Sequence, residues 1–259
     1  MTRTLAFTRA VSESIARCEL THVARAPIDL PRARAQHADY ERALASAGCE
    51  VVRLPELPEH GDAVFVDDCA LALPELAVIT RPGAESRRGE VASVVAALAP
   101  HRPLARIEAP ATLDGGDVLA LGRTLCVGLS QRTNAEGVRQ LRECAAPLGY
   151  AVEAIPVAGA LHLQTAVTCA DERTLVVNPS WVDARRFASA GWEILEVDAR
   201  EPFAANVLRV RGTTLCAAAF PRTNERLRAR GIAVVEVAAD ELAKAEGGVT
   251  CCALLVEIS

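Results

Sequence analysis

The chain has 259 residues, of which 51% are hydrophobic and 24% charged, as is ordinary for a folded globular protein. A net charge of −5 argues against a basic surface for nucleic acid or anionic lipid, and no apolar run approaches the ~20 residues needed to span a bilayer. The N-terminus lacks the apolar core of a signal peptide, so we expect a cytoplasmic protein without nucleic-acid or membrane partners.

In chain order, the hydrophobic pattern first predicts a strand at 5–8, a helix at 31–47 and a strand at 51–54. A longer unit follows, with strands at 69–73 and 76–79 that end at the Pro82-Gly83 breaker. Its helix begins near Arg88 with apolar residues at helical spacing, and a strand at 104–107 closes it. The unit is therefore strand, strand, helix, strand.

The same ββαβ order recurs in the rest of the chain. The later copies have strands at 118–121, 124–127 and 151–155 with a helix at 134–148, strands at 165–168, 174–177 and 193–197 with a helix from about 180, and strands at 207–210, 214–218 and 233–237 with a helix at 223–230.

The final strand, 252–258, would complete a fifth copy with the N-terminal elements, so that the two ends of the chain pair. One such unit is too short to bury its helix alone. We therefore expect one α/β domain, 1–259, built from five units and closed by the terminal segments.

Polar residues recur every 44 to 48 residues, each just before the first strand of its unit. The set is Asp67, Asp114, His162, Asn206 and Cys251. Repeated units that place one group each at an equivalent point can direct all of them at a common centre. The set contains a thiol, an imidazole and carboxylates.

Each residue alone has a more ordinary explanation. A cysteine is commonly a small buried hydrophobic residue, and there are nine, an odd number without a Cys-x-x-Cys spacing, so neither disulfides nor a thiolate metal site is expected. Cys252 should face away from Cys251 if both lie on a strand. His162 could be a core histidine, and Asn206 could be a turn residue without a chemical role. Their joint position favours a site.

Six segments together closely resemble the dimethylarginine dimethylaminohydrolase family of the guanidino-group-modifying superfamily. They are residues 64–68, 79–88, 113–118, 132–134, 161–163 and 247–251. The resemblance covers nearly the whole chain in order and implies a five-bladed α/β-propeller. It also implies hydrolysis of Nω,Nω-dimethyl-L-arginine, or the monomethyl form, to L-citrulline and the amine.

The resemblance assigns Cys251 as the nucleophile that forms a covalent thiouronium intermediate. His162 matches the general acid and later general base, and Asp114 matches the carboxylate that orients this histidine. A guanidinium carbon is a poor electrophile, so a thiolate nucleophile suits the chemistry.

Matched substrate-binding positions complete the site. Asp67 and Asp68 would bind the guanidinium, and Arg87 and Arg132 the α-carboxylate. The amino-acid end would contact Asp62 and the backbone of Leu20 and Ala245. No cofactor is implied, and no metal is expected, because Cys251 and His162 alone are too few ligands for a structural zinc site.

Position 164 helps to choose among relatives. Arginine and agmatine deiminases resemble this pattern but carry aspartate two residues after the histidine, where this chain has Gln164. A buried carboxylate facing two methyl groups would be unpaired, at a cost of several kcal/mol. If Gln164 faces the leaving amine, it favours a methylated substrate. A deiminase-like hydrolase and a non-catalytic propeller binding protein are the alternatives.

Overall fold

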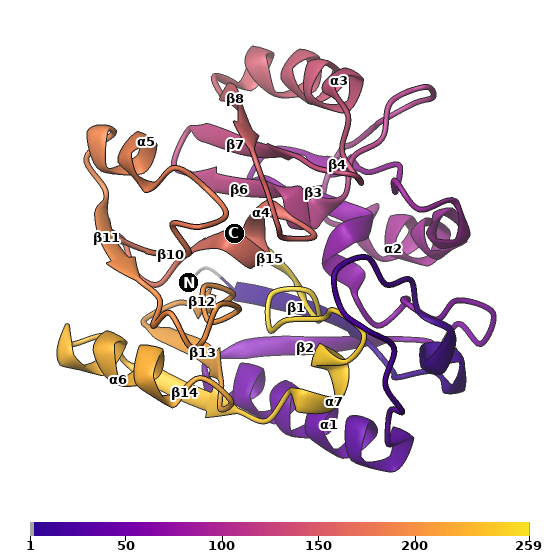
Figure 1. Ribbon diagram of the computed structural model, residues 1–259. Coiled ribbons are helices and arrows are strands. Elements are labelled where there is room, and N and C mark those ends of the chain that lie inside the picture. Colours follow the sequence, from indigo (N-terminus) through magenta and orange to yellow (C-terminus); the bar gives the residue numbers. More distant parts are fainter. Residues whose placement is uncertain (1–2, 259) are drawn as a thin grey trace.

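The computed structural model describes residues 3–258, within which the strands form five three-stranded sheets around a common centre (Figure 1). In every sheet the first two strands are antiparallel and the third is parallel to the second. A parallel neighbour needs a long crossover connection, which a helix supplies in each unit. The repeated ββαβ unit predicted from the sequence is confirmed.

One sheet joins the two ends of the chain. It contains β15 (Leu254–Ile258), β1 (Arg3–Arg9) and β2 (Cys49–Leu54), with α1 (Leu30–Ser46) as its crossover helix. Leu5 pairs with Val256 in the antiparallel register that was expected for the terminal segments.

The other four sheets follow in chain order. Their elements are β3 (Ala70–Ala72), β4 (Ala77–Ile79), α2 (Val91–Leu98) and β5 (Leu104–Arg106); β6 (Val118–Leu121), β7 (Thr124–Leu129), α3 (Ala135–Ala145) and β8 (Ala151–Pro156); β9 (Val167–Cys169), β10 (Thr174–Val177), α5 (Ala184–Ser189) and β11 (Glu193–Glu196); and β12 (Leu208–Val210), β13 (Thr213–Ala217), α6 (Pro221–Ala229) and β14 (Val234–Val237).

Five hydrophobic clusters link these sheets into a ring. Each cluster draws buried side chains from two neighbouring sheets, and the first cluster joins the fourth unit back to the terminal sheet. For example, Leu5 and Ile79 share one cluster, while Leu44 and Leu215 share another. The fold is therefore the five-bladed α/β-propeller that the family resemblance implied, with its cores between the blades.

Several predicted boundaries differ from the structure, and two of them have a clear local cause. Thr165 belongs to a single helical turn, α4 (Leu163–Ala166), and β9 starts only at Val167, because Thr165 donates its backbone N–H to the carbonyl of His162. The third crossover helix starts at Ala184, where Asp183 caps its N-terminus by accepting the N–H of Arg185.

Short helical turns hold the starts of the blades close together at the centre. Among them are η2 (Val66–Cys69) and η4 (Gly115–Asp117). A side chain at Gly115 would place its Cβ 1.9 Å from the carbonyl oxygen of Asp67, so only glycine lets these two turns meet. No helix within residues 3–258 is long and apolar enough to cross a membrane.

Candidate active site

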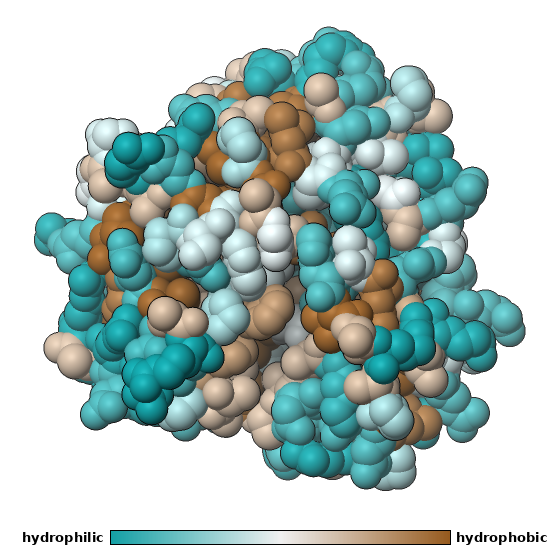
Figure 2. Space-filling model, viewed as in Figure 1, coloured by the Kyte–Doolittle hydropathy of each residue, from teal (hydrophilic) through white to brown (hydrophobic). Residues whose placement is uncertain are grey.

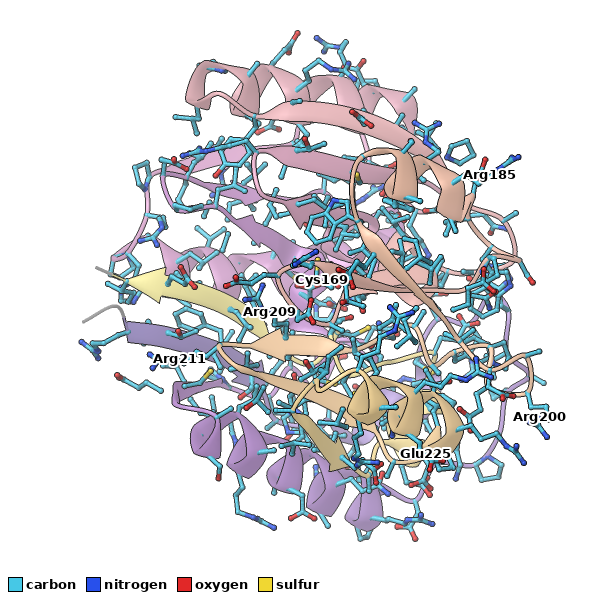
Figure 3. All side chains as sticks on the ribbon, turned by 90° about the vertical axis from the view of Figure 1, so that its left-hand side faces the viewer. Cys169, Arg185, Arg200, Arg209, Arg211 and Glu225 are labelled. Carbon is cyan, nitrogen blue, oxygen red and sulfur yellow. The ribbon has the colours of Figure 1, made fainter. Side chains whose placement is uncertain are left out.

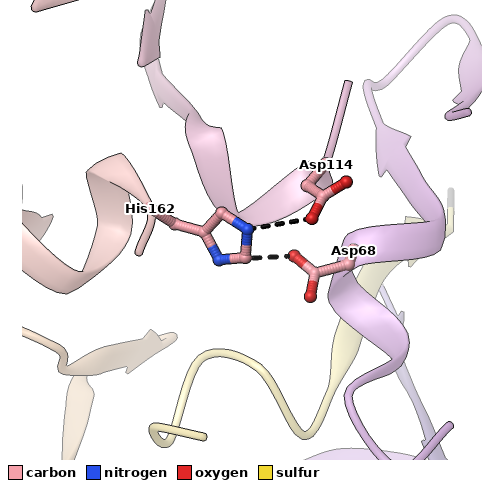
Figure 4. Close-up of side chains that lie close together, drawn as sticks. All are labelled: Asp68, Asp114 and His162. Carbon is pink, nitrogen blue, oxygen red and sulfur yellow. Dashed lines mark hydrogen bonds and ion pairs between the residues drawn. The ribbon is translucent and has the colours of Figure 1, made fainter. Parts of the chain in front are cut away.

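All five evenly spaced polar residues lie just before the first strands of their sheets, where the sequence placed them. The side chains of two of them are in direct contact, because His162 Nε2 is 2.9 Å from Asp114 Oδ2 (Figure 4). On the other side of the ring, Nδ1 lies 3.8 Å from Asp68 Oδ1. The imidazole is thus held between carboxylates from two other blades, and all three side chains are buried.

The charge state of His162 follows from these neighbours. Burial by itself lowers the pKa of an imidazole, but the carboxylates of Asp68, Asp114 and Asp117 outweigh it and raise the pKa of His162 to about 9. Asp117 also fixes the backbone, since it accepts the N–H of Leu163 at 3.0 Å and the hydroxyl of Ser130. At neutral pH the imidazole is protonated and can donate a proton.

Cys251 and Cys252 lie in a turn before β15, not on a strand, so their opposite directions come from the turn rather than from strand alternation. The Cys252 side chain is buried in the core between the fourth unit and the terminal sheet. Cys251 Sγ accepts the backbone N–H of Gly248 at 3.3 Å. Burial and the charge of Asp68 nevertheless raise the pKa of the Cys251 thiol to about 12.

A buried ion-pair network fixes the neighbouring carboxylate. Arg87 Nη1 donates to Asp68 Oδ2 at 2.5 Å, and its Nε and Nη2 donate to Glu90 at 2.9 to 3.2 Å. Nη2 also donates to the carbonyl of Phe65. Burial would raise the pKa of Asp68, but His162 and Arg87 lower it to about 2. Asp68 is therefore ionised and lies between two cationic side chains, those of His162 and Arg87.

A narrow cavity of about 10 Å³ joins these groups, which is about the space of one water molecule. Of the predicted site residues, it is lined by Asp62, Asp68, Arg87, Arg132, His162, Ala245 and Cys251. Its wall carries both acidic and basic side chains. Such a lining suits a small ligand that carries both charges.

The amino-acid end of the cavity contains Arg132 and Asp62. Arg132 is 7% exposed, and its guanidinium forms a loose ion pair, with Nη1 3.8 Å from Asp114 Oδ2. Asp62 accepts the N–H of Glu19, and burial raises its pKa to about 6 against the opposing charge of Arg87. Arg132 thus has donors left for an anionic group, whereas most donors of Arg87 already have partners.

Three of the predicted site residues do not line this cavity. Asp114 lies behind His162, and Leu20 packs against the core next to the lining residue Glu19. Asp67 belongs to a second cavity on the far side of the propeller centre. Burial and the nearby charge of Asp68 raise the pKa of Asp67 well above its ordinary value.

Gln164 also lies in that second cavity, whose wall includes Cys169 and Arg209 (Figure 3). Its amide nitrogen donates to the carbonyls of Val118 and Gly115 at 3.0 and 3.3 Å and to Asp67 at 3.4 Å. The expectation that Gln164 faces the leaving amine is therefore wrong in this structure. Its direction was set by carbonyl acceptors that its local sequence does not reveal.

Sequence reasoning missed several residues of the site. Glu19, Phe65, Leu161 and Glu246 line the cavity. Glu246 accepts the backbone N–H groups of Thr21, His22 and Val23, so it fixes the segment that carries Glu19. These contacts join residues more than 220 positions apart, so no local pattern predicts them. The only signal in the sequence was that the missed residues lie close to positions that match the family.

An apolar cavity of about 320 Å³ adjoins the site and shares Leu161 and Glu246 with it. Its wall includes Phe203, Phe220 and the start of α7 (Asp240–Ala243). In Figure 2, pale and tan residues extend from the centre of this face to a groove at its lower edge, between hydrophilic flanks. This cavity holds none of the catalytic candidates.

Among the described residues, Asp68, Asp114 and His162 form one group whose ligand atoms lie within 4.8 Å of one another. In the protonated state both ring nitrogens of His162 carry hydrogens, so no lone pair is free for a metal; Nε2 is hydrogen-bonded to Asp114, and Nδ1 lies 3.8 Å from Asp68. The geometry fits an ion-pair network better than a metal site.

Comparison with known proteins points to one family. The family model for eukaryotic N,N-dimethylarginine dimethylhydrolase matches residues 23–258. An N(G),N(G)-dimethylarginine dimethylaminohydrolase from Streptomyces coelicolor is 40% identical over 248 residues, which cover 95% of this chain and 94% of that protein. The protein of the same name from Pseudomonas aeruginosa is 35% identical over 228 residues, covering 87% and 89%.

Solved structures agree with these relatives. A dimethylarginine dimethylaminohydrolase in an adduct with S-methyl-L-thiocitrulline has a TM-score of 0.92 and 32% identity, covering 98% of this chain and 100% of that one. The Pseudomonas aeruginosa enzyme, as a cysteine-to-serine variant with citrulline, matches with the same TM-score and identity over 98% and 99%. A cyanobacterial arginine dihydrolase, 18% identical with a TM-score of 0.82, shares the fold.

Proposed function

The chain belongs to the dimethylarginine dimethylaminohydrolase family, and on this premise we propose that it hydrolyses Nω,Nω-dimethyl-L-arginine to L-citrulline and dimethylamine. Nω-monomethyl-L-arginine is the second expected substrate and yields methylamine. The observation that carries the proposal is one cavity lined by a thiol, a protonated imidazole, a buried carboxylate and two arginines. We assign the activity to a single catalytic domain, residues 1–259, because four of the five units contribute to this wall.

Cys251 is the proposed nucleophile. The thiol loses its proton to solvent when the cationic substrate binds, and the resulting Sγ thiolate forms a bond to the guanidinium carbon, giving a tetrahedral adduct. His162 then donates its proton to the dimethylated nitrogen, the C–N bond breaks, and dimethylamine leaves a thiouronium. The neutral His162 next takes a proton from water, whose oxygen attacks the same carbon and expels the thiolate. The second water proton leaves the forming carbonyl for solvent, where the released amine takes up a proton, so that citrulline departs and His162 is again protonated.

Substrate binding supplies the positive charge that favours ionisation of the Cys251 thiol. With a pKa of about 12, the thiol is protonated at neutral pH when the cavity holds no cation. A guanidinium placed between Asp68 and Cys251 adds a positive charge close to Sγ and lowers the pKa of the thiol. Nucleophile activation is thereby coupled to the arrival of a cationic substrate.

Arg132 is the proposed principal partner of the α-carboxylate, because Arg87 is largely bound by Glu90, Asp68 and Phe65. One Nη1 hydrogen of Arg87 is left to assist it. Asp62 and the backbone of Leu20 and Ala245 would receive the α-ammonium group. Asp68 would bind the unmethylated side of the guanidinium, and Asp67 would support it from behind the floor of the cavity.

Arg132→Lys tests the assignment of the α-carboxylate. We expect KM for dimethylarginine to rise about tenfold or more with a smaller change in kcat, because lysine cannot reproduce two-pronged binding. Steady-state kinetics with substrates that have and lack the α-carboxylate provide the measurement. The matched control is Arg88→Lys on the neighbouring 3-10 helix, where Arg88 pairs with exposed Glu85. An equal loss for the substrate without a carboxylate would contradict the assignment.

Gln164→Asp tests the geometry of the second cavity. The new carboxylate would face the carbonyls of Gly115 and Val118 and the carboxyl group of Asp67 without a donor in return, which favours a loss of stability of about 1 to 3 kcal/mol. Because the residue lies behind the cavity floor, we expect the ratio of kcat/KM for dimethylarginine to that for arginine to stay the same. A marked change in that ratio would place the side chain at the leaving group.

The direct test of the proposal is citrulline formation with dimethylarginine, monomethylarginine and arginine assayed side by side. We expect turnover of the methylated substrates and far less of arginine. A preference for arginine would favour a deiminase, and no turnover of any of them would favour a binding protein.

A further inference from the structure

Asn206 is the one member of the evenly spaced polar set that the proposed chemistry leaves without a role. It precedes β12 as Cys251 precedes β15 and His162 precedes β9. Its side chain is buried, with 6% of the residue exposed. A buried amide must be hydrogen-bonded, so its partners indicate what it does.

Both ends of the Asn206 amide bind the residue next to the nucleophile. Oδ1 accepts the backbone N–H of Thr250 at 3.1 Å, and Nδ2 donates to the Thr250 hydroxyl at 2.7 Å. The second hydrogen of Nδ2 goes to the carbonyl of Gln164 at 3.1 Å, two residues after His162. One side chain therefore ties the turn of Cys251 to the segment of His162.

These bonds fix the direction of the Thr250 hydroxyl. Because an amide nitrogen can only donate, the oxygen of Thr250 accepts from Asn206 and its own hydrogen is left to donate elsewhere. The neighbouring acceptor is Cys251 Sγ, 3.9 Å from the hydroxyl oxygen. The chain of donors runs from Asn206 through Thr250 to the sulfur.

Asn206 also supports the second donor to that sulfur. Gly248 packs directly on the amide, since a Cβ at this position would lie 2.3 Å from Asn206 Oδ1. The backbone N–H of Gly248 is the group that donates to Sγ at 3.3 Å. The turn is thus seated on Asn206 with two donors directed at one sulfur atom.

We propose that Asn206 is a positioning residue for the nucleophile, which holds the Thr250 hydroxyl and the Gly248 N–H toward Cys251 Sγ and keeps their turn in register with His162. This proposal rests on the proposed role of Cys251 as the nucleophile. Removing the amide should weaken the stabilisation of the thiolate without touching any group that binds substrate.

Other charged groups around Cys251 remain the same in the variants that test this role. They are Asp67 and Asp68 of η2, His162 before α4, Arg87 from the turn before α2, and Glu19, Asp62, Arg132 and Glu246 on the cavity wall. Differences between wild type and an Asn206 variant therefore report on Asn206 and its partners.

The experiment measures alkylation of Cys251 by iodoacetamide from pH 7 to 10, located by peptide mass spectrometry. In Asn206→Leu and Asn206→Asp we expect the rate at Cys251 to fall about three- to tenfold at each pH, because the reactive form is the thiolate. Aspartate accepts the hydroxyl hydrogen and turns it away from sulfur, whereas leucine removes the constraint without adding charge. A slower rate in Asn206→Asp alone would mean a simple charge effect and would overturn the proposal.

Asn178 provides the matched control. It is 4% exposed and uses its amide in the same way, donating to the carbonyl of Pro202 and accepting the N–H of Ser180, both at 2.9 Å. Asn178→Leu and Asn178→Asp should carry a similar folding penalty and leave the alkylation of Cys251 unchanged. An equal effect from the Asn178 variants would assign the loss to general destabilisation and overturn the proposal.

Thr250 variants keep the test decisive if the Asn206 variants fold poorly. Thr250→Ser retains the hydroxyl and should alkylate at nearly the wild-type rate, whereas Thr250→Val should be slower. Asn206→Leu should slow alkylation less in the Thr250→Val background than in the wild type, because the hydroxyl contribution is already lost and only the support of Gly248 remains. Fully additive losses in the alkylation rate would contradict an effect of Asn206 that passes through the Thr250 hydroxyl. Alkylation requires no turnover, so failure here is distinguishable from failure of the proposed function, which the citrulline assay detects.

Discussion

Replacing Cys251 with serine is expected to lower kcat for dimethylarginine by at least about 10³-fold, because removal of a catalytic nucleophile has effects of this size or larger. A serine hydroxyl ionises at much higher pH than a thiol, and the guanidinium carbon is a weak electrophile. The variant should still bind substrate, since Asp68, Arg132 and the other lining groups are unchanged. When the variant is mixed with substrate and stopped within one turnover, intact-protein mass spectrometry should detect no covalent adduct.

Cys252→Ser is the matched control, one residue away. Cys252 is buried in the core, and its nearest polar partner is the carbonyl of Gly248 at 3.6 Å. We expect most of the activity to remain, with some loss of stability from the buried hydroxyl. Activity retained in Cys251→Ser and lost in Cys252→Ser would reassign the nucleophile.

His162→Gln is expected to lower kcat by about 10²- to 10⁴-fold, the range for loss of a general acid or base. Glutamine can keep a hydrogen bond to Asp114 but cannot deliver a proton to the leaving amine. The loss of kcat should be smaller for a substrate analogue whose leaving group does not need protonation, because that substrate requires no general acid. Equal losses for both leaving groups would mean that His162 acts mainly by holding Asp114 and Asp68.

The pH dependence provides a second check on the same residue. The protonated imidazole is the acid, so activity should decline as the pH rises through its pKa of about 9. Asp114→Asn removes one of the carboxylates that raise this pKa, so the alkaline limb of kcat/KM should move to lower pH. Replacing exposed Asp183 with asparagine on α5 should leave the limb in place. An unmoved limb in Asp114→Asn would separate Asp114 from the titration of His162.

Local sequence patterns determined the fold of this protein. Alternating and helical spacing of apolar residues depends on neighbours a few positions away, and that information was enough to identify five ββαβ units and the pairing of 5–8 with 252–258. The even spacing of Asp67, Asp114, His162, Asn206 and Cys251 likewise marked equivalent points of the units. Repetition converts sequence distance into a shared centre, which is why these five positions could be grouped from the sequence, whereas the catalytic roles of three of them came from the family resemblance.

The tertiary structure alone decided where individual side chains point and which donors are free. Gln164 turns to carbonyls of another blade, and Arg87 is largely bound by Glu90 and Asp68. Glu246 reaches the cavity through contacts with residues near the other end of the chain. Each outcome is a competition for hydrogen-bond partners among groups distant in sequence. Spacing can bring such groups to one place, but only their packed geometry determines which of them pair.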